Sequence, residues 1–279
     1  MIEIMNDQRV FLNHGPIQMV LDISSKGLKE SKIAIDVANR VMEQFEKMLV
    51  YINEAKSKNI ESEIPDHYPE VLKKMMHAVR LVGDISYTPL AAVAGSFSEF
   101  ALERAIEQGA GRVIINNGGD IALRDIEGNQ ILVGIPLTND PSGKRIEIAI
   151  TDSMGIRGIC TSGFGGRSFT KGVADKAVAL GYSASVADVC ATFIGNETNV
   201  DDRSIVRALA DEIDSGTDLT GQLITLSVNG LSRESKLRAL LNGYYAMEKL
   251  YNKNIIIGGV VMVGEDVMTI PDHIAVIKN

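Results

Sequence analysis

Ala187-Asp188-Val189-Cys190-Ala191-Thr192 is the segment that says most about the fold and function of this chain. In a helix, an acid and a hydroxyl four residues apart share one face, so Asp188 and Thr192 are placed to hold one hard cation. A helix cap is the alternative. Ser185 precedes Asp188 by three residues, as in a capping box, and a helical threonine often bonds to its own backbone. The metal-site interpretation therefore requires Asp188 and Thr192 together.

Two segments rich in glycine and small polar residues precede this helix, at 116–120 (Asn-Asn-Gly-Gly-Asp) and at 160–166 (Cys-Thr-Ser-Gly-Phe-Gly-Gly). Backbone amides beside glycine approach a phosphate closely, which makes both segments candidates for a nucleotide site. A β-turn is an equally good interpretation of the first segment, because isoleucines flank it on both sides. For the second, four glycines between 158 and 166, a Thr-Ser pair and Arg167 exceed what a simple connection needs. We therefore weigh an anion site there equally against a plain loop.

The order and spacing of these motifs resemble the FAD:protein FMN transferase (ApbE) family. In that family a strand ends in Asn-x-Gly-Gly-Asp, a Thr-Ser-Gly follows, and an Ala-Asp-x-x-Ala-Thr helix comes last; all three occur here in that order. From 161 to 196 the sequence is most similar to an ApbE-like branch found in archaea and anaerobic bacteria. The sequence contains no long linker and no repeat, so we expect a single ApbE-like domain over 1–279. The resemblance is specific over a motif-bearing core at about 85–196, which leaves 197–279 as a C-terminal extension.

The resemblance also implies roles for individual residues. Asp188 and Thr192 match the side chains that bind Mg²⁺ beside the FAD pyrophosphate. The residues that match the flavin-lining loop and the second glycine turn are Thr161, Ser162, Gly163, Gly118 and Gly119. If the protein is an enzyme, Asp120 or Glu99 is the acid that activates the acceptor. The implied cofactors are Mg²⁺ and FAD or a related nucleotide.

Two departures from the transferase pattern bear on activity. Where transferases carry Lys-Gly-Tyr-Ala-Val-Asp, this chain has Ala94-Gly95-Ser96-Phe97-Ser98-Glu99, so the lysine is replaced by alanine and the aspartate by glutamate. The transferase His-Ile-x-Asp-Pro motif is also missing, and no histidine occurs between residues 78 and 272. These departures favour ligand binding over group transfer.

The function that the resemblance implies is therefore a cytosolic flavin- or nucleotide-binding accessory protein in anaerobic metabolism. Relatives in the branch are associated with sulfur assimilation into homocysteine, which implies protein partners in sulfur metabolism. A homo-oligomer is a separate expectation. One alternative is an Mg²⁺-dependent FAD:protein FMN transferase or FAD pyrophosphatase. Another is a structural or assembly factor that retains only a vestigial site.

Composition excludes several other classes. The chain has 279 residues, of which 45% are hydrophobic, and a formal net charge of −8, which argues against nucleic acid or an anionic membrane as the main partner. Its first residues lack signal-peptide features and no early cysteine is available for a lipid, so we expect a cytosolic protein. Cys160 and Cys190 are isolated thiols that we expect to pack as small apolar residues, although Cys160 beside a glycine-rich segment is a candidate reactive thiol. The four histidines have no zinc-site spacing.

Hydrophobic periodicity and turn signals predict an α+β fold with a mixed, largely antiparallel sheet packed with helices. Predicted strands span 9–12, 17–23, 113–115, 121–124, 130–135, 146–151, 223–228 and 255–263. Predicted helices span 29–52, 69–82, 96–108, 202–213 and 233–251, besides the helix that carries Asp188. A stripe of Val37, Val41, Phe45 and Leu49 is expected to face the core, and turns are expected at 127–129 and 140–143.

Overall fold

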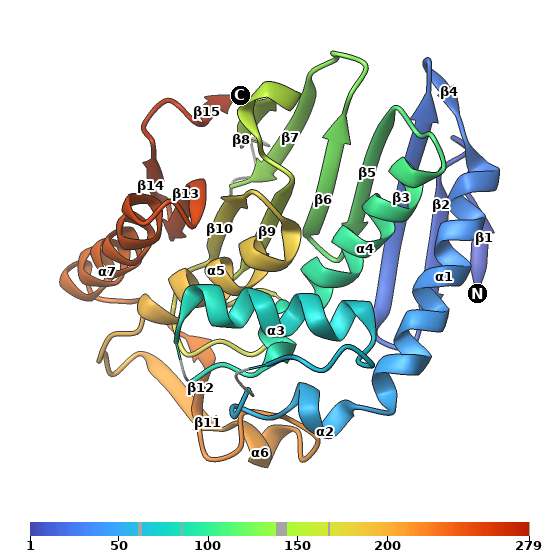
Figure 1. Ribbon diagram of the computed structural model, residues 1–279. Coiled ribbons are helices and arrows are strands. Elements are labelled where there is room, and N and C mark those ends of the chain that lie inside the picture. Colours follow the sequence, from blue (N-terminus) through green and yellow to red (C-terminus); the bar gives the residue numbers. More distant parts are fainter. Residues whose placement is uncertain (61–62, 85, 138–143, 167, 279) are drawn as a thin grey trace. The chain divides into compact units, whose positions relative to one another are not determined.

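A computed structural model describes residues 1–60, 63–84, 86–137, 144–166 and 168–278 (Figure 1). Its contacts group the chain into two compact units. Unit 1 consists of Met1–Ile131, Ile150–Cys160 and Leu180–Val189; unit 2 consists of Leu132–Ala149, Thr161–Ala179 and Cys190–Asn279. The first residue of the expected core, Ile85, the expected turn at 140–143 and Arg167 lie outside the described residues. The single domain expected from the sequence stays a prediction.

An antiparallel sheet forms the body of unit 1. Its strands lie in the order β1 (Ile2–Ile4), β2 (Val10–His14), β3 (Ile17–Ser25), β5 (Arg112–Asn117), β6 (Asp120–Asp125) and β9 (Gly158–Ser162), and β4 (Leu28–Lys29) pairs with β3. In β5 the buried residues Val113, Ile115 and Asn117 alternate with more accessible ones, as expected when helices cover one face of a sheet.

Helices cover one face of this sheet. The helices of unit 1 are α1 (Ser31–Leu49), the short α2 (Ile52–Ala55), α3 (Glu70–Val82), and α4 (Val93–Glu107), which directly follows a 3₁₀ turn, η1 (Pro89–Ala92). Of these, α3 packs on α1 and α4, and α2 packs on α3. Figure 1 shows α1 and α4 across the strands, where α4 contacts β5 and β6 and α1 contacts β2 and β3. Val37, Val41 and Phe45 of the predicted stripe are buried, but Leu49 is 41% exposed and Met48 is buried instead. The last position of the stripe was therefore wrong, because α1 ends there.

Unit 2 contains one long helix, a two-stranded sheet, a three-stranded sheet and further strands. Its elements are β7 (Ile131–Pro136), β8 (Arg145–Ile150), β10 (Lys176–Gly181), β11 (Ile205–Leu209), α6 (Ala210–Ile213), β12 (Leu223–Val228), α7 (Arg233–Asn252), β13 (Ile256–Val263), β14 (Asp266–Ile270) and β15 (Val276–Lys278). The first residue of β7, the last of β8 and the last two of β10 belong to unit 1. The pairs β11–β12, β13–β14 and β8–β15 are antiparallel, and α7 packs against β13 and β14. The helix α5 (Ala184–Glu197) begins in unit 1 and ends in unit 2, while a short 3₁₀ turn, η2 (Asp152–Met154), belongs to unit 1.

Two predictions of local structure were wrong. The helix expected at 202–213 is a strand, β11, followed by the single turn α6. The carboxylate of Asp202 accepts hydrogen bonds from the backbone N–H and the hydroxyl of Ser204, and this local turn competes with helix formation. The supposed loop at 158–166 is a strand, β9, as far as Ser162, because Ile159 pairs with Ile121 of β6. The predicted α+β class with a largely antiparallel sheet is confirmed.

Within the described residues, every helix is too short or too polar to cross a membrane.

Candidate functional site

The residues expected at the site are divided between the two units. Unit 1 contains Asp188, Asp120, Glu99, Gly118 and Gly119. Unit 2 contains Thr161, Ser162, Gly163 and Thr192. The division falls after Cys160 in β9 and after Val189 in α5.

The Asn-Asn-Gly-Gly-Asp segment is the hairpin turn between β5 and β6. Gly118 and Gly119 have φ of 69° and 109°, the left-handed region that glycine adopts most readily, and the N–H of Gly119 donates to Asn116 Oδ1 at 2.9 Å. The β-turn interpretation is confirmed, and ligand binding by these glycines stays a prediction. Asp120 begins β6, and its carbonyl oxygen accepts a hydrogen bond from Ser98 Oγ of α4 at 2.8 Å.

Asp188 lies against the N-terminus of α4. Its Oδ2 accepts a hydrogen bond from the N–H of Gly95 at 2.8 Å. This N–H belongs to the first turn of α4, where backbone donors lack partners inside the helix, and the N-cap residue Ala92 has no side chain that can accept one. A negatively charged acceptor is favoured there by the helix dipole. Asp188, carried by α5, therefore caps α4.

The capping box proposed for Ser185 and Asp188 is wrong. The N–H of Ser185 donates to Glu99 Oε2 at 2.9 Å, while Asp188 is engaged with α4. The side chain at the start of α5 that accepts from its own helix is Ser183, whose Oγ receives the N–H of Val186 at 3.3 Å. The side chain of Asp188 therefore does not cap its own helix, as the sequence pattern suggested, but binds to α4.

The charge of Asp120 affects the pKa values of both Asp188 and Cys160. Burial raises the pKa of Asp188 well above its ordinary value, and the negative charge of Asp120 raises it further, against the N–H donors of α4 that lower it. Burial likewise raises the pKa of the Cys160 thiol, followed by the charges of Asp120 and Asp188. Cys160 is fully buried and donates to the carbonyl of Ala184, so the reactive-thiol alternative is contradicted.

The donor set in unit 1 suits a hard cation. Asp188 and Asp120 offer carboxylate oxygens, the ligands that Mg²⁺ prefers, and a cation between them would relieve their repulsion. Among the described residues, no group of three or more His, Cys, Asp or Glu side chains is placed to hold a metal. Mg²⁺ commonly binds through only one or two carboxylates and takes its other ligands from phosphates and water. The residues present therefore fit Mg²⁺ bound together with a phosphorylated ligand.

We expect Asp188→Asn to stabilise the metal-free protein near neutral pH. Because the folded state raises the pKa of Asp188, ionisation of this carboxyl favours the unfolded chain. The stability that protonated Asp188 contributes is complete below the pKa that it has in the unfolded chain. This stability is lost as pH rises through the raised pKa that it has in the folded protein. Asparagine stays neutral, and its side-chain oxygen can still accept from Gly95. Urea unfolding in EDTA should show the advantage of the variant shrink as pH falls.

Asp125→Asn provides a control of opposite sign. Burial raises the pKa of Asp125, but Arg112 and the backbone N–H groups of Asn129 and Glu127 outweigh it and lower the pKa on balance. Its stabilising effect is present above the unfolded pKa and lost as pH falls through the folded one. Asp125→Asn should therefore destabilise the protein at neutral pH. A loss of stability in both variants would show that Asp188 is an ordinary stabilising carboxylate.

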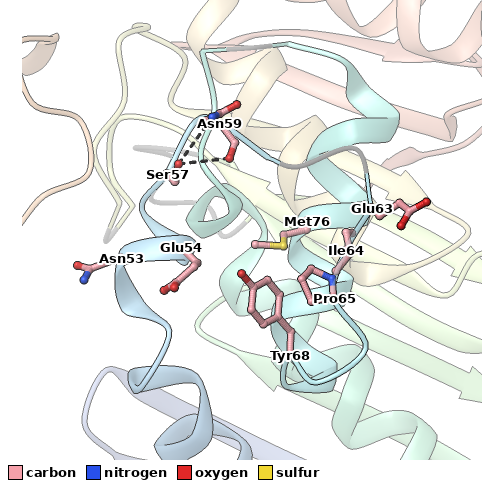
Figure 2. A pocket seen from close by; sticks show the side chains of 9 residues that line it. All are labelled: Asn53, Glu54, Ser57, Asn59, Glu63, Ile64, Pro65, Tyr68 and Met76. Carbon is pink, nitrogen blue, oxygen red and sulfur yellow. Dashed lines mark hydrogen bonds between the residues drawn. The ribbon is translucent and has the colours of Figure 1, made fainter.

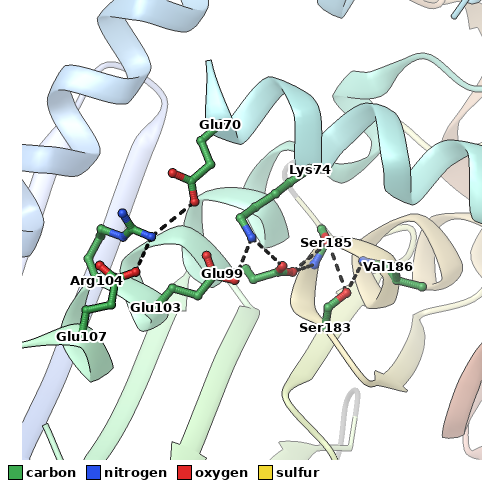
Figure 3. A network of polar contacts seen from close by, with 9 residues as sticks. All are labelled: Glu70, Lys74, Glu99, Glu103, Arg104, Glu107, Ser183, Ser185 and Val186. Atoms are coloured by element: carbon green, nitrogen blue, oxygen red, sulfur yellow. Dashed lines mark hydrogen bonds and ion pairs between the residues drawn. The ribbon is translucent and has the colours of Figure 1, made fainter. Parts of the chain in front are cut away.

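The side chain of Glu99, a residue of α4, reaches the start of α5, and both of its carboxylate oxygens accept hydrogen bonds (Figure 3). Oε2 accepts from the N–H and Oγ of Ser185 at 2.9 and 2.7 Å, and Oε1 pairs with Lys74 Nζ of α3 at 3.0 Å. These are the contacts of a group that holds a helix end. The catalytic roles expected for Glu99 and Asp120 stay predictions. Lys74 escaped sequence reasoning, because no local pattern connects it to Glu99.

In unit 2 the Thr-Ser-Gly motif ends β9 and enters a tight turn. Gly163 has φ of 143°, and a Cβ there would lie 2.6 Å from the carbonyl oxygen of Asp175. The N–H of Phe164 donates to the carbonyl of Ala174 at 2.7 Å, so two segments of unit 2 run close together. Thr192 is half-buried on the second part of α5. Ligand contacts of Thr161, Ser162, Gly163 and Thr192, and the anion site, stay predictions.

Thr198 is a buried residue of unit 2 that sequence reasoning missed. Its Oγ1 accepts the N–H groups of Val173 and Ala174, each at 2.9 Å, and donates to the carbonyl of Gly195 at 2.6 Å. No sequence signal distinguishes it from an ordinary threonine after a helix. It ties the end of α5 to the segment that contacts the Thr-Ser-Gly turn.

A separate pocket of about 280 Å³ lies in unit 1 between α2, the chain that follows it and α3 (Figure 2). Glu54, Tyr68 and Met76 are among the residues that line it. None of the residues expected at the site contributes to it, so the pocket does not belong to the candidate site.

Comparison with known proteins identifies relatives in archaea. The chain is 37% identical over 144 residues to a UPF0280 protein of Methanosarcina barkeri, covering 51% of this chain and 54% of the relative. A UPF0280 protein of Methanopyrus kandleri is 38% identical over 162 residues, covering 57% and 61%. One of Methanothrix thermoacetophila is 38% identical over 137 residues, covering 49% and 55%. The chain spans little more than half the length of the curated relatives it matches.

Two solved structures align with most of this chain. The flavin transferase ApbE from Vibrio cholerae has a TM-score of 0.49 at 11% identity, covering 94% of this chain and 95% of that one. The apo form of the Pseudomonas stutzeri flavinyl transferase ApbE has the same TM-score and identity, covering 96% and 93%.

A family model described as "AbpE bacteria" matches residues 2–269. This match extends over nearly all of the chain and confirms the resemblance inferred from the three motifs. The protein therefore belongs to the family that this model, AbpE bacteria, describes.

Proposed function

We propose that this protein binds a flavin or a related nucleotide together with Mg²⁺, at a site that includes Asp188 and Asp120. The supporting observation is the pair of carboxylates itself: burial raises the pKa of Asp188, the negative charge of Asp120 raises it further, and the N–H of Gly95 fixes Asp188 at the N-terminus of α4. The carboxylate of Asp188 accepts hydrogen bonds from N–H groups at the start of α4, and the cation would bind to this carboxylate and to that of Asp120. Thr192 as a second metal ligand is part of the proposal and rests on the resemblance.

Binding without group transfer is the activity that these residues favour. Ala94 occupies the position of the transferase lysine, and no histidine lies between 78 and 272. The raised pKa of Cys160 keeps its thiol protonated, which removes it as a nucleophile. We therefore propose an accessory protein. Its place in sulfur assimilation, with the protein partners that this implies, rests on the resemblance alone. The homo-oligomer is a separate part of the proposal.

Calorimetric titration tests the proposal. Metal-stripped wild-type protein is titrated with FAD, FMN, ADP and AMP, each with and without Mg²⁺. We expect binding only with Mg²⁺, and an affinity at least about tenfold lower in Asp188→Asn, because the neutral amide is a poorer ligand for a hard cation. Asp125→Asn removes a buried carboxylate at the opposite end of β6 from Asp120 and should leave the affinity unchanged.

The other functions correspond to other outcomes. Release of AMP from FAD in the presence of Mg²⁺, absent in Asp188→Asn, would establish a transferase or pyrophosphatase. Equal, weak binding of every nucleotide by wild-type protein and Asp188→Asn would contradict the proposal and favour a structural or assembly factor.

A further inference from the structure

We infer that Glu99 is the positioning residue for Asp188: held by Lys74, it fixes the start of the helix that carries the proposed cation ligand. The inference rests on the proposed function and assigns to Glu99 a role distinct from acceptor activation. It is drawn from the contacts among α3, α4 and the first turn of α5, all of which belong to unit 1.

The two helices cap each other. Asp188 of α5 accepts the N–H of Gly95 at the start of α4, and Glu99 of α4 accepts the N–H of Ser185 at the start of α5. On α4 the two contacts are four residues apart, and on α5 three, so on each helix they lie on one face. Each carboxylate satisfies backbone donors that its partner helix leaves unpaired. A displacement of α5 at Ser185 therefore also displaces Asp188, one turn further along.

Lys74 determines the direction in which Glu99 points. Its Nζ contacts Glu99 at 3.0 Å and Glu103 at 2.7 Å, and the side chains of Lys74 and Glu99 are only 17% and 15% exposed. Burial alone would lower the pKa of Lys74, but the charges of Glu99 and Glu103 outweigh it, so the pKa is raised and the ammonium persists. Figure 3 shows Glu99 between Lys74 on one side and Ser185 on the other, while Glu103 is linked to Lys74 only.

This difference between Glu99 and Glu103 supplies a matched control. Both are glutamates of α4 and both pair with Lys74, but only Glu99 reaches α5. If both residues only stabilised their ion pairs with Lys74, replacing either one would have the same effect on ligand affinity. A positioning role makes ligand affinity depend on Glu99 alone.

The test compares Glu99→Ala, Glu99→Gln and Glu103→Ala by calorimetry with FAD and Mg²⁺. We expect Glu99→Ala to weaken binding about tenfold, as the loss of a helix cap allows. Glu99→Gln retains an oxygen that accepts from Ser185 and should recover most of the affinity, and Glu103→Ala should stay within about twofold of wild type. Equal weakening by Glu99→Ala and Glu103→Ala, or no recovery in Glu99→Gln, would overturn the inference.

Hydrogen exchange separates this inference from the proposed function. In metal-free protein, the amides of Ser185 and Val186 should exchange faster in Glu99→Ala and keep wild-type rates in Glu103→Ala. If wild-type protein binds neither Mg²⁺ nor a nucleotide, the proposed function fails and the exchange measurement alone decides the role of Glu99. Unchanged exchange in Glu99→Ala would refute it in either case.

Discussion

Gly95→Ala is expected to destabilise the protein strongly and to abolish binding at the proposed site. A Cβ at this position would lie 2.2 Å from the backbone oxygen of Ala184 and 2.8 Å from Asp188 Cβ. Because the nearest atom belongs to the backbone, no side-chain rotation relieves the contact, and α5 must move away from α4. The same movement separates Asp188 from the N–H of Gly95.

Two opposing effects decide the size of the change. Alanine improves helix propensity over glycine by about 1 kcal/mol. Overpacking typically costs about 1–3 kcal/mol, and we expect the upper end of this range here because backbone must shift. The free energy of unfolding should therefore fall by about 2 kcal/mol, since the steric term is larger. Urea unfolding followed by circular dichroism measures the change.

Gly158→Ala tests the same close packing around Ala184, the first residue of α5, from β9 instead of α4. A Cβ at Gly158 in β9 would lie 2.4 Å from Ala184 Cα, so this variant should be destabilised as Gly95→Ala is. Gly216→Ala is the control, because its Cβ would meet only the tip of the Asp214 side chain at 3.2 Å, and its effect should stay within about 0.5 kcal/mol. Wild-type stability in Gly95→Ala would mean that α5 does not begin against α4.

The elements that could be predicted from sequence are those whose information is local. Helix α3 was expected at 69–82 and spans Glu70–Val82, because its apolar residues recur at helical spacing and Gly83, with φ of 75°, ends it. The hairpin turn at 116–120 was recoverable for the same reason, since two glycines supply the left-handed angles that it requires. The helix predicted at 202–213 does not form because the side chain of Asp202 accepts a hydrogen bond from the backbone N–H of Ser204. This local turn competes with the helical pattern of the following residues.

The contacts of the candidate site could not be predicted in this way. The identities of Asp188 and Asp120 followed from motifs, but the partner of Asp188 is 93 residues away in the sequence and that of Glu99 is 86 residues away. Periodicity within one segment contains no information about which two helix ends meet. For this reason Ser185 and Asp188 resembled a local cap, whereas each bonds to α4.

Thr198→Val is expected to lower the free energy of unfolding by about 3 kcal/mol. The substitution preserves the shape of the side chain and removes the one oxygen on which two backbone N–H groups, those of Val173 and Ala174, converge. Thr198 is completely buried, so neither donor regains water when the oxygen is lost. Each unsatisfied buried donor costs about 1–3 kcal/mol, and the bond to Gly195 is lost as well.

Thr225→Val separates this effect from the general cost of removing a buried hydroxyl. Thr225 is 7% exposed, but its Oγ1 makes a single, longer bond of 3.3 Å to the carbonyl of Lys171, so about 1 kcal/mol is expected. Urea unfolding gives both values, and hydrogen exchange should show lost protection at Val173 and Ala174 in Thr198→Val only. Equal losses in the two variants would contradict the specific role of Thr198.

Since Ala174 also accepts the N–H of Phe164, beside Gly163, loss of Thr198 should loosen the Thr-Ser-Gly turn while leaving the carboxylate pair of unit 1 intact.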